Sequence, residues 1–140
     1  MSHHLIPHSD LRQKTQKYVH SLWQAEWSLQ TSNKLFEIRP NLSDALPGTT
    51  SGRKAETVLC RLHTGHSHYT HSYLLRGEEP PHCIPCNKPI SIKHVLLDCW
   101  DLYDVRRKYF TATSIRLLFR DVPPDKIFRF LHEVNLLSKL

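Results

Sequence analysis

The chain has 140 residues, a mass of 16.4 kDa, a formal net charge of +6, four cysteines and four glycines. Hydrophobic residues make up 39% and charged residues 23%, which favours a folded helical chain over a disordered or collagen-like one. The length is too short for a polymerase or a kinase, and the Gly-x-Gly-x-x-Gly, Gly-x-Ser-x-Gly and His-Glu-x-x-His motifs are missing. No apolar run approaches the roughly 18 residues that span a bilayer, so we expect no membrane partner. We also expect no small-molecule substrate.

The first third of the chain predicts a long helix followed by an extended segment. Residues 1–9 are polar and rich in histidine, and we expect a disordered start or the remnant of a linker. Residues 10–50 then form an N-terminal helix, from the N-cap Asp10 to about Thr31, and an extended loop that begins with residues 34–38. Trp23 and Trp27 share one face of this helix. We interpret them as core anchors, and the alternative is a base-stacking surface.

The remaining residues predict short amphipathic helices separated by glycines and prolines. One helix follows Ser51, places Cys60 in the core and is succeeded by another that ends near Leu75. A third apolar pattern follows Ser91. Residues 51–110 thus form a helical region that contains the cysteine motif, and residues 111–140 form C-terminal helices at about 115–119 and 126–137. We predict an all-α fold, with irregular loops, that is one compact unit from about residue 10 to residue 140.

Three of the four cysteines stand in a metal-binding pattern. The spacing Cys-x2-Cys-x7-His-x4-Cys comprises Cys83, Cys86, His94 and Cys99. A turn presents the first two sulfurs to one ion, and the later imidazole and thiolate complete a tetrahedral shell of the kind that Zn²⁺ prefers. Because this shell leaves no open position, the predicted zinc ion is structural and the domain carries an embedded zinc-knuckle-like site. A disulfide framework is disfavoured because no secretory signal precedes the cysteines, and we expect an intracellular protein of the nucleus or the cytoplasm.

The ligand set leaves two alternatives open. On an unbroken α-helix His94 and Cys99 lie about 140° apart, so either the helix is interrupted between them or another group, such as His82, completes the shell. A second cluster of imidazoles can be read as another metal site or as caps and packing groups, and its members are His63, His66, His68 and His71.

The positive charge is dispersed along the chain, with an excess of +1, +3 and +2 over residues 1–52, 53–108 and 109–140. The cations and the tryptophan nearest the cysteine motif are the predicted nucleic-acid contacts, namely Lys88, Lys93, Trp100, Arg106, Arg107 and Lys108. Asp98, Asp101 and Asp104 interleave with these cations, so part of the region can be an ordinary solvated helix face. With about three to five phosphate contacts, binding is expected to be modest and sensitive to salt.

Several motifs in this order resemble the C-terminal region of LINE-type (non-LTR) retrotransposon proteins, downstream of reverse transcriptase and ribonuclease H. The resemblance covers roughly residues 8–140, and Gly65-His66, Thr70-His71 and the zinc spacing are its sharpest parts. The other matching motifs are Trp23-Gln24, Trp27, Asn33-Lys34-Leu35, Val58-Leu59-Cys60-Arg61-Leu62, Tyr73-Leu74-Leu75, Tyr103, Arg106, Ile127-Phe128-Arg129-Phe130-Leu131 and Leu136-Leu137.

The resemblance implies a region that helps such a polyprotein to hold RNA or target DNA. The polymerase and nuclease motifs are missing, and a ribonuclease H site needs carboxylates on two metal ions, whereas the first thirty residues hold only Asp10 and Glu26. We therefore expect a non-catalytic nucleic-acid-binding tail. The alternatives are a scaffolding module that packs on the upstream ribonuclease H-like domain and, more remotely, a metallohydrolase that uses His63, His66 and His71.

Overall fold

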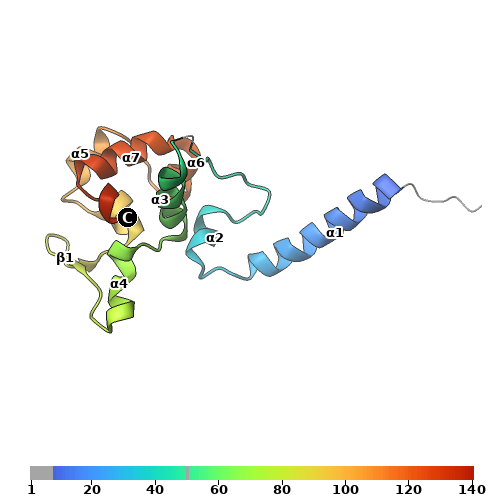
Figure 1. Cartoon of the computed structure of the whole chain (residues 1–140), viewed down its shortest axis with the longest axis horizontal. Helices are drawn as coiled ribbons and strands as arrows, with labels where there is room; N and C mark the ends of the chain where they lie inside the picture. Colours follow the sequence, from blue (N-terminus) through green and yellow to red (C-terminus); the bar gives the residue numbers. More distant parts are fainter. Residues whose placement is uncertain (1–7, 50) are drawn as a thin grey trace, which may run out of the picture.

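The computed structural model of the protein describes residues 8–49 and 51–140. Of the expected disordered start at residues 1–9, residues 1–7 lie outside the described residues, whereas His8 and Ser9 belong to a helix. The described chain is mostly helical, as predicted, with one two-stranded antiparallel hairpin (Figure 1). Its elements are α1 (His8–Ser28), α2 (Lys34–Ile38), α3 (Arg53–Thr64), α4 (His68–Arg76), β1 (His82–Cys83), β2 (Lys88–Pro89), the π-helical turn η1 (His94–Asp98), α5 (Tyr103–Arg107), α6 (Ile115–Asp121), α7 (Pro124–Glu133) and the 3₁₀ turn η2 (Leu137–Lys139). In this part of the chain no helix combines the length and the apolar character of a bilayer span.

The hydrophobic core lies between α3, η1, α6 and α7. Leu96, Leu118 and Phe130 have no exposed surface, and Phe110 meets Phe130 edge to face at 5.4 Å between ring centroids. The η1 turn is therefore packed into the core and is not a surface loop. The buried apolar residues of this cluster are Ile38, Val58, Leu62, Ile92, Val95, Leu96, Phe110, Ile115, Leu118, Phe119, Ile127, Phe130, Leu131, Leu136 and Leu140.

Local signals in the sequence fix the ends of α3 and α4. Gly65 ends α3 with a φ of 68°, a conformation that favours glycine, and a Cβ at this position would lie 2.7 Å from Cδ of Lys34 and displace that side chain. Ser67 and Thr70 then form a capping box that starts α4. The tight turn between the two helices is built from these three residues.

Three sequence-based expectations are corrected by the structure. Residues 34–38 form the helix α2 and not an extended segment, because the Asn33 side chain accepts the amide of Leu35 and caps a turn that buries Ile38. Cys60 is exposed, since it lies on the face of α3 opposite Val58 and Leu62. The last helix ends at Glu133 instead of continuing to residue 137, because Asn135 adopts a φ of 56°.

Helix α1 extends away from the helices of the core as an arm (Figure 1). Its C-terminal part is held by Trp27, which packs on Phe36 at 5.7 Å and donates its indole N–H to the carbonyl of Arg39 at 2.7 Å. Gln24 adds hydrogen bonds to the backbone of Pro40 and Leu42. Trp23 is 66% exposed, so its expected role as a core anchor is wrong; Trp27 alone of the pair is half-buried.

A half-buried imidazole on α3 gives a prediction for the dependence of stability on pH. Burial lowers the pKa of His63, whose ring packs edge to face on Phe119 at 4.6 Å between centroids. Since the unfolded chain binds this proton at higher pH, the contribution of His63 to stability is complete above about pH 6.5 and is lost as the pH falls below it. We expect urea unfolding between pH 8 and pH 5 to show a smaller loss of stability in His63→Leu than in the wild type. Parallel curves for the two proteins would contradict this assignment.

Candidate metal centre

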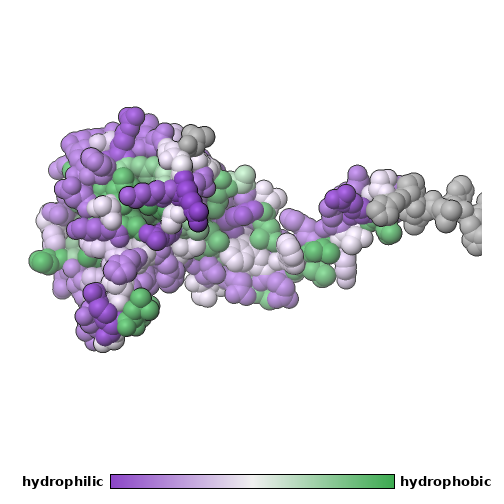
Figure 2. Space-filling model, viewed as in Figure 1, coloured by the Kyte–Doolittle hydropathy of each residue, from purple (hydrophilic) through white to green (hydrophobic). Residues whose placement is uncertain are grey.

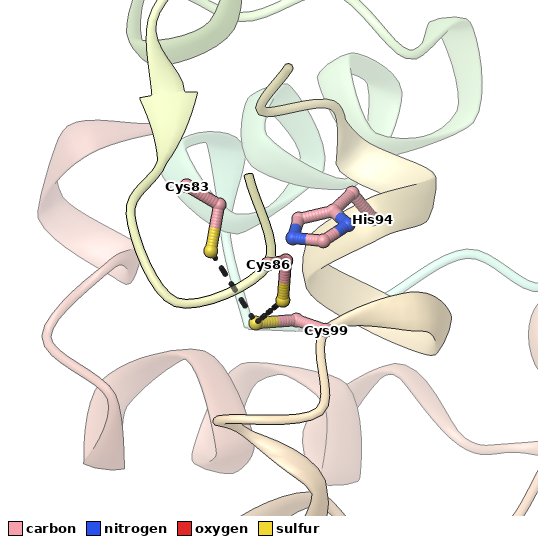
Figure 3. A group of neighbouring side chains, drawn as sticks. All are labelled: Cys83, Cys86, His94 and Cys99. Carbon is pink, nitrogen blue, oxygen red and sulfur yellow. Dashed lines mark hydrogen bonds between the residues drawn. The ribbon is translucent and has the colours of Figure 1, made fainter. Parts of the chain in front are cut away.

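Four side chains from the hairpin and from η1 converge on one point. Cys83 lies in β1, Cys86 lies in the turn after it, His94 begins η1 and Cys99 follows η1 directly. Their ligand atoms all lie within 4.8 Å of one another, and Figure 3 shows the four side chains turned toward a common centre. The structure thus brings together the four residues of the predicted ligand set, and this group can bind a metal ion.

The hairpin positions the first two sulfurs. His82 pairs with Pro89 and Cys83 pairs with Lys88, which leaves a tight turn that contains Cys86. Asn87 closes this turn with a φ of 49° and donates its amide to the carbonyl of Cys83 at 2.8 Å. These backbone hydrogen bonds hold the turn in place, and the turn presents the thiols of Cys83 and Cys86 on the same side.

The second pair of ligands depends on the π-helical form of η1. The amide of Cys99 donates to the carbonyl of His94 at 2.7 Å, which is the i to i+5 bond that defines a π turn. The wider turn brings residues five apart toward one face, whereas an α-helix would separate them. Of the two alternatives left open by the sequence, the structure shows the interrupted α-helix. His82 is exposed and does not belong to the group of four.

The sulfur atoms are close but not bonded to one another. The Sγ atom of Cys99 lies 3.8 Å from that of Cys83 and 3.6 Å from that of Cys86, and all cysteines of the chain are free thiols. A disulfide would need about 2.05 Å. The arrangement therefore presents three separate sulfur ligands.

The protonation chemistry of the centre suits a metal ion. Burial lowers the pKa of His94, which keeps the imidazole neutral, and its buried Nε2 has no hydrogen-bond partner among the described residues. Burial raises the pKa of the Cys99 thiol to about 11. For Cys86, burial raises the pKa, but hydrogen bonds from the backbone of Trp100 and from the neighbouring thiols outweigh it and the net pKa is lowered. Metal ligation requires a cysteine thiolate, so a cation bound at this centre would offset the raised pKa of Cys99.

Arg106 supports the centre from the core side. Its side chain is buried, and the guanidinium donates to the carbonyl of Cys99 at 3.0 Å and to that of Val95 at 3.4 Å. These contacts satisfy carbonyls at the end of the π turn and place a positive charge beside the thiols. The sequence places Arg106 among the nucleic-acid contacts, but a buried guanidinium does not face a phosphate, so we remove it from that set.

The other predicted nucleic-acid contacts lie on more than one part of the surface. Lys93 pairs with Glu37 of α2 and Lys108 pairs with Glu133 of α7, each at 2.6 Å. Lys88 is exposed on β2, beside the centre. Trp100 is 65% exposed and donates its indole N–H to the carbonyl of Pro85 in the hairpin turn. The guanidinium of Arg107 lies 5.4 Å from the centroid of the exposed Tyr103 ring.

The histidine cluster does not form a second metal centre in the described part of the chain. The imidazoles of His66 and His71 lie 4.0 Å apart between ring centroids at an interplanar angle of 35°, and His71 also approaches Lys34 and forms a hydrogen bond with Thr70. His63 instead packs on Phe119, and His68 is exposed at the start of α4. Since no three of these imidazoles converge among the described residues, packing and capping are the roles that the structure supports.

No protein-family model matches this chain, and neither the curated proteins nor the solved structures provide a match. The assignment of the candidate metal centre therefore rests on the arrangement of its four residues.

Proposed function

We propose that the protein is a zinc-stabilised, non-catalytic nucleic-acid-binding module that acts as the tail of a LINE-type retrotransposon polyprotein inside the cell. Zinc is the ion that best suits three sulfurs and one neutral imidazole. A tetrahedron with Zn–S bonds of about 2.3 Å has edges of about 3.8 Å, and the two sulfur–sulfur distances in the centre are 3.8 and 3.6 Å. Four protein ligands close the shell, so the ion stabilises the fold and leaves no position for an activated water.

The observation that carries nucleic-acid binding is the set of exposed side chains next to the zinc ligand Cys99. Trp100 and Tyr103 are both more than half exposed, and Arg107 lies over the Tyr103 ring. Lys88 is exposed on β2 of the hairpin. Exposed aromatic rings stack on unpaired bases, and nearby cations contact the phosphates. Three carboxylates, Asp98, Asp101 and Asp104, lie on the same stretch, so we propose that stacking contributes more to binding than charge does.

A variant of one tryptophan tests this surface. Trp100→Ala is expected to weaken binding of a fluorescein-labelled single-stranded RNA oligonucleotide about tenfold, because one stacking contact is lost. The measurement is fluorescence anisotropy at two salt concentrations, with the metal content of each protein checked. Trp23→Ala is the matched control, since Trp23 is equally exposed but lies on the α1 arm. Equal binding by the two variants, or no binding by the wild type, would overturn the assigned surface.

One observation favours a second candidate function, a protein-interaction module that packs on the upstream ribonuclease H-like domain. Apolar residues of α1, among them Leu22 and Trp23, are exposed. Absence of measurable RNA affinity, with or without self-association of the chain, would favour this candidate over the first.

A further inference from the structure

One face of α1 carries an apolar stripe that no other described residue covers. Figure 2 shows apolar side chains at the surface along the arm. Tyr18 is 65% exposed and Leu22 is 49% exposed, although both lie in the middle of a 21-residue helix. The stripe comprises Leu11, Tyr18, Leu22 and Ala25 with Thr15 as its one polar position, and Leu29 continues it directly after the helix.

The spacing of the stripe is that of a coiled-coil seam. Leu11, Tyr18 and Ala25 are seven residues apart, and Thr15, Leu22 and Leu29 repeat at the same interval, four residues further on. Alternating steps of four and three residues place all six side chains on one narrow face of a helix. Single exposed apolar residues are ordinary on a protein surface, but a continuous stripe over three heptads is typical of an interaction surface.

The opposite face of α1 is already used by its own domain. Gln24 and Trp27 lie roughly half a turn away from Leu22 and Leu29, and they hold the helix to the backbone of residues 39–42. The stripe is therefore directed away from the contacts that fix α1, and it is free to meet another helix.

The flanking charges select the partner and its direction. Arg12 and Glu26 lie on the same side of the stripe, seven residues before and seven residues after Val19. In an antiparallel pair centred on this region, Arg12 of each copy faces Glu26 of the other, and Tyr18 faces Leu22. In a parallel pair Glu26 would instead face Ser21, and neither ion pair would form.

We propose that α1 pairs with α1 of a second copy of this chain as a short antiparallel coiled coil. This proposal is independent of nucleic-acid binding. Because α1 projects from the core as an arm, an antiparallel pair places the two domains at opposite ends of helices about 31 Å long. A parallel pair would place both domains at the same end. The helix has only three heptads and a threonine in its seam, so we expect a weak dimer in reversible equilibrium with the monomer, with a dimer fraction that rises with concentration.

Sedimentation velocity of the full chain over a range of concentrations tests self-association without RNA. The wild type is expected to shift from monomer to dimer, and Leu22→Lys is expected to remain a monomer at every concentration. Leu74→Lys is the matched control, since Leu74 is 63% exposed on α4, outside the stripe, and this variant is expected to dimerise like the wild type. Circular dichroism and metal content confirm that each variant folds. A wild-type protein that stays monomeric at every concentration would overturn the proposal and would indicate that the stripe binds a different partner.

A charge exchange tests the antiparallel direction. Arg12→Glu and Glu26→Arg are each expected to weaken dimerisation about tenfold, because the twofold symmetry places two like-charged pairs in each dimer. The double variant R12E/E26R restores opposite charges at both ends and is expected to dimerise within about twofold of the wild type. Failure of the double variant to recover would overturn the antiparallel pairing.

Discussion

Treatment with an excess of a metal chelator is expected to unfold the segment around the candidate metal centre and to lower the free energy of unfolding by more than about 3 kcal/mol. The hairpin has two residues in each strand, and Ile84 at its tip is 93% exposed, so apolar burial does not hold it closed. Under the proposed zinc site, the ion links Cys83 and Cys86 to His94 and Cys99, and the attachment of the hairpin to η1 depends on this link. Hydrogen exchange is expected to show loss of protection over residues 80–105.

The same experiment has an internal control and a control variant. Helices α6 and α7 carry much of the apolar core, and they are expected to keep more of their exchange protection than the hairpin does. Cys60→Ser removes the cysteine that lies outside the cluster, so it is expected to respond to the chelator as the wild type does. Unchanged exchange over residues 80–105 after chelation would show that no ion holds this segment.

Replacement of Arg106 by alanine is expected to destabilise the protein by about 2–4 kcal/mol. The guanidinium holds the carbonyls of Cys99 and Val95, and its removal leaves buried acceptors without a donor beside the metal centre. The measurement is urea unfolding of the metal-loaded protein. Arg107→Ala is the matched control, because Arg107 is exposed on the next position of α5, and it is expected to change stability by less than about 0.5 kcal/mol.

The roles assigned to these two neighbours, Arg106 in stability and Arg107 in RNA binding, can also be compared in an RNA-binding measurement. Arg107→Ala is expected to weaken RNA binding, since its guanidinium lies beside the exposed Tyr103 ring. Equal losses of stability for Arg106→Ala and Arg107→Ala would contradict the structural role of Arg106.

The sequence allowed the ligand set to be predicted because spacing and residue type carry that information. Cys83 and Cys86 are a turn apart, and the chemistry of His94 and Cys99 matches them. The path of the backbone between His94 and Cys99 could not be predicted, because the π turn packs Val95 and Leu96 into the core and this packing leaves no local sequence pattern.

The errors of prediction arise where tertiary contacts decide the outcome. The burial of Arg106 follows from its hydrogen bonds to the carbonyls of Val95 and Cys99 in and after the π turn, whereas its position in a run of basic residues indicated a surface. Trp23 lies four residues from Trp27, but α2 and the loop that follows it contact Trp27 alone of the two. Short helices such as α2 are set by a single cap, Asn33, that a periodicity argument over five residues cannot detect.

The metal content of the purified protein tests the metal centre most directly. Elemental analysis after expression without added chelator is expected to give one zinc ion per chain in the wild type and in Cys60→Ser, because Cys60 lies outside the cluster. Cys99→Ser, which removes the buried sulfur shared by both short sulfur–sulfur contacts, is expected to lose the zinc. A folded wild-type protein that contains no zinc, or a Cys99→Ser variant that keeps a full equivalent, would contradict the proposed site.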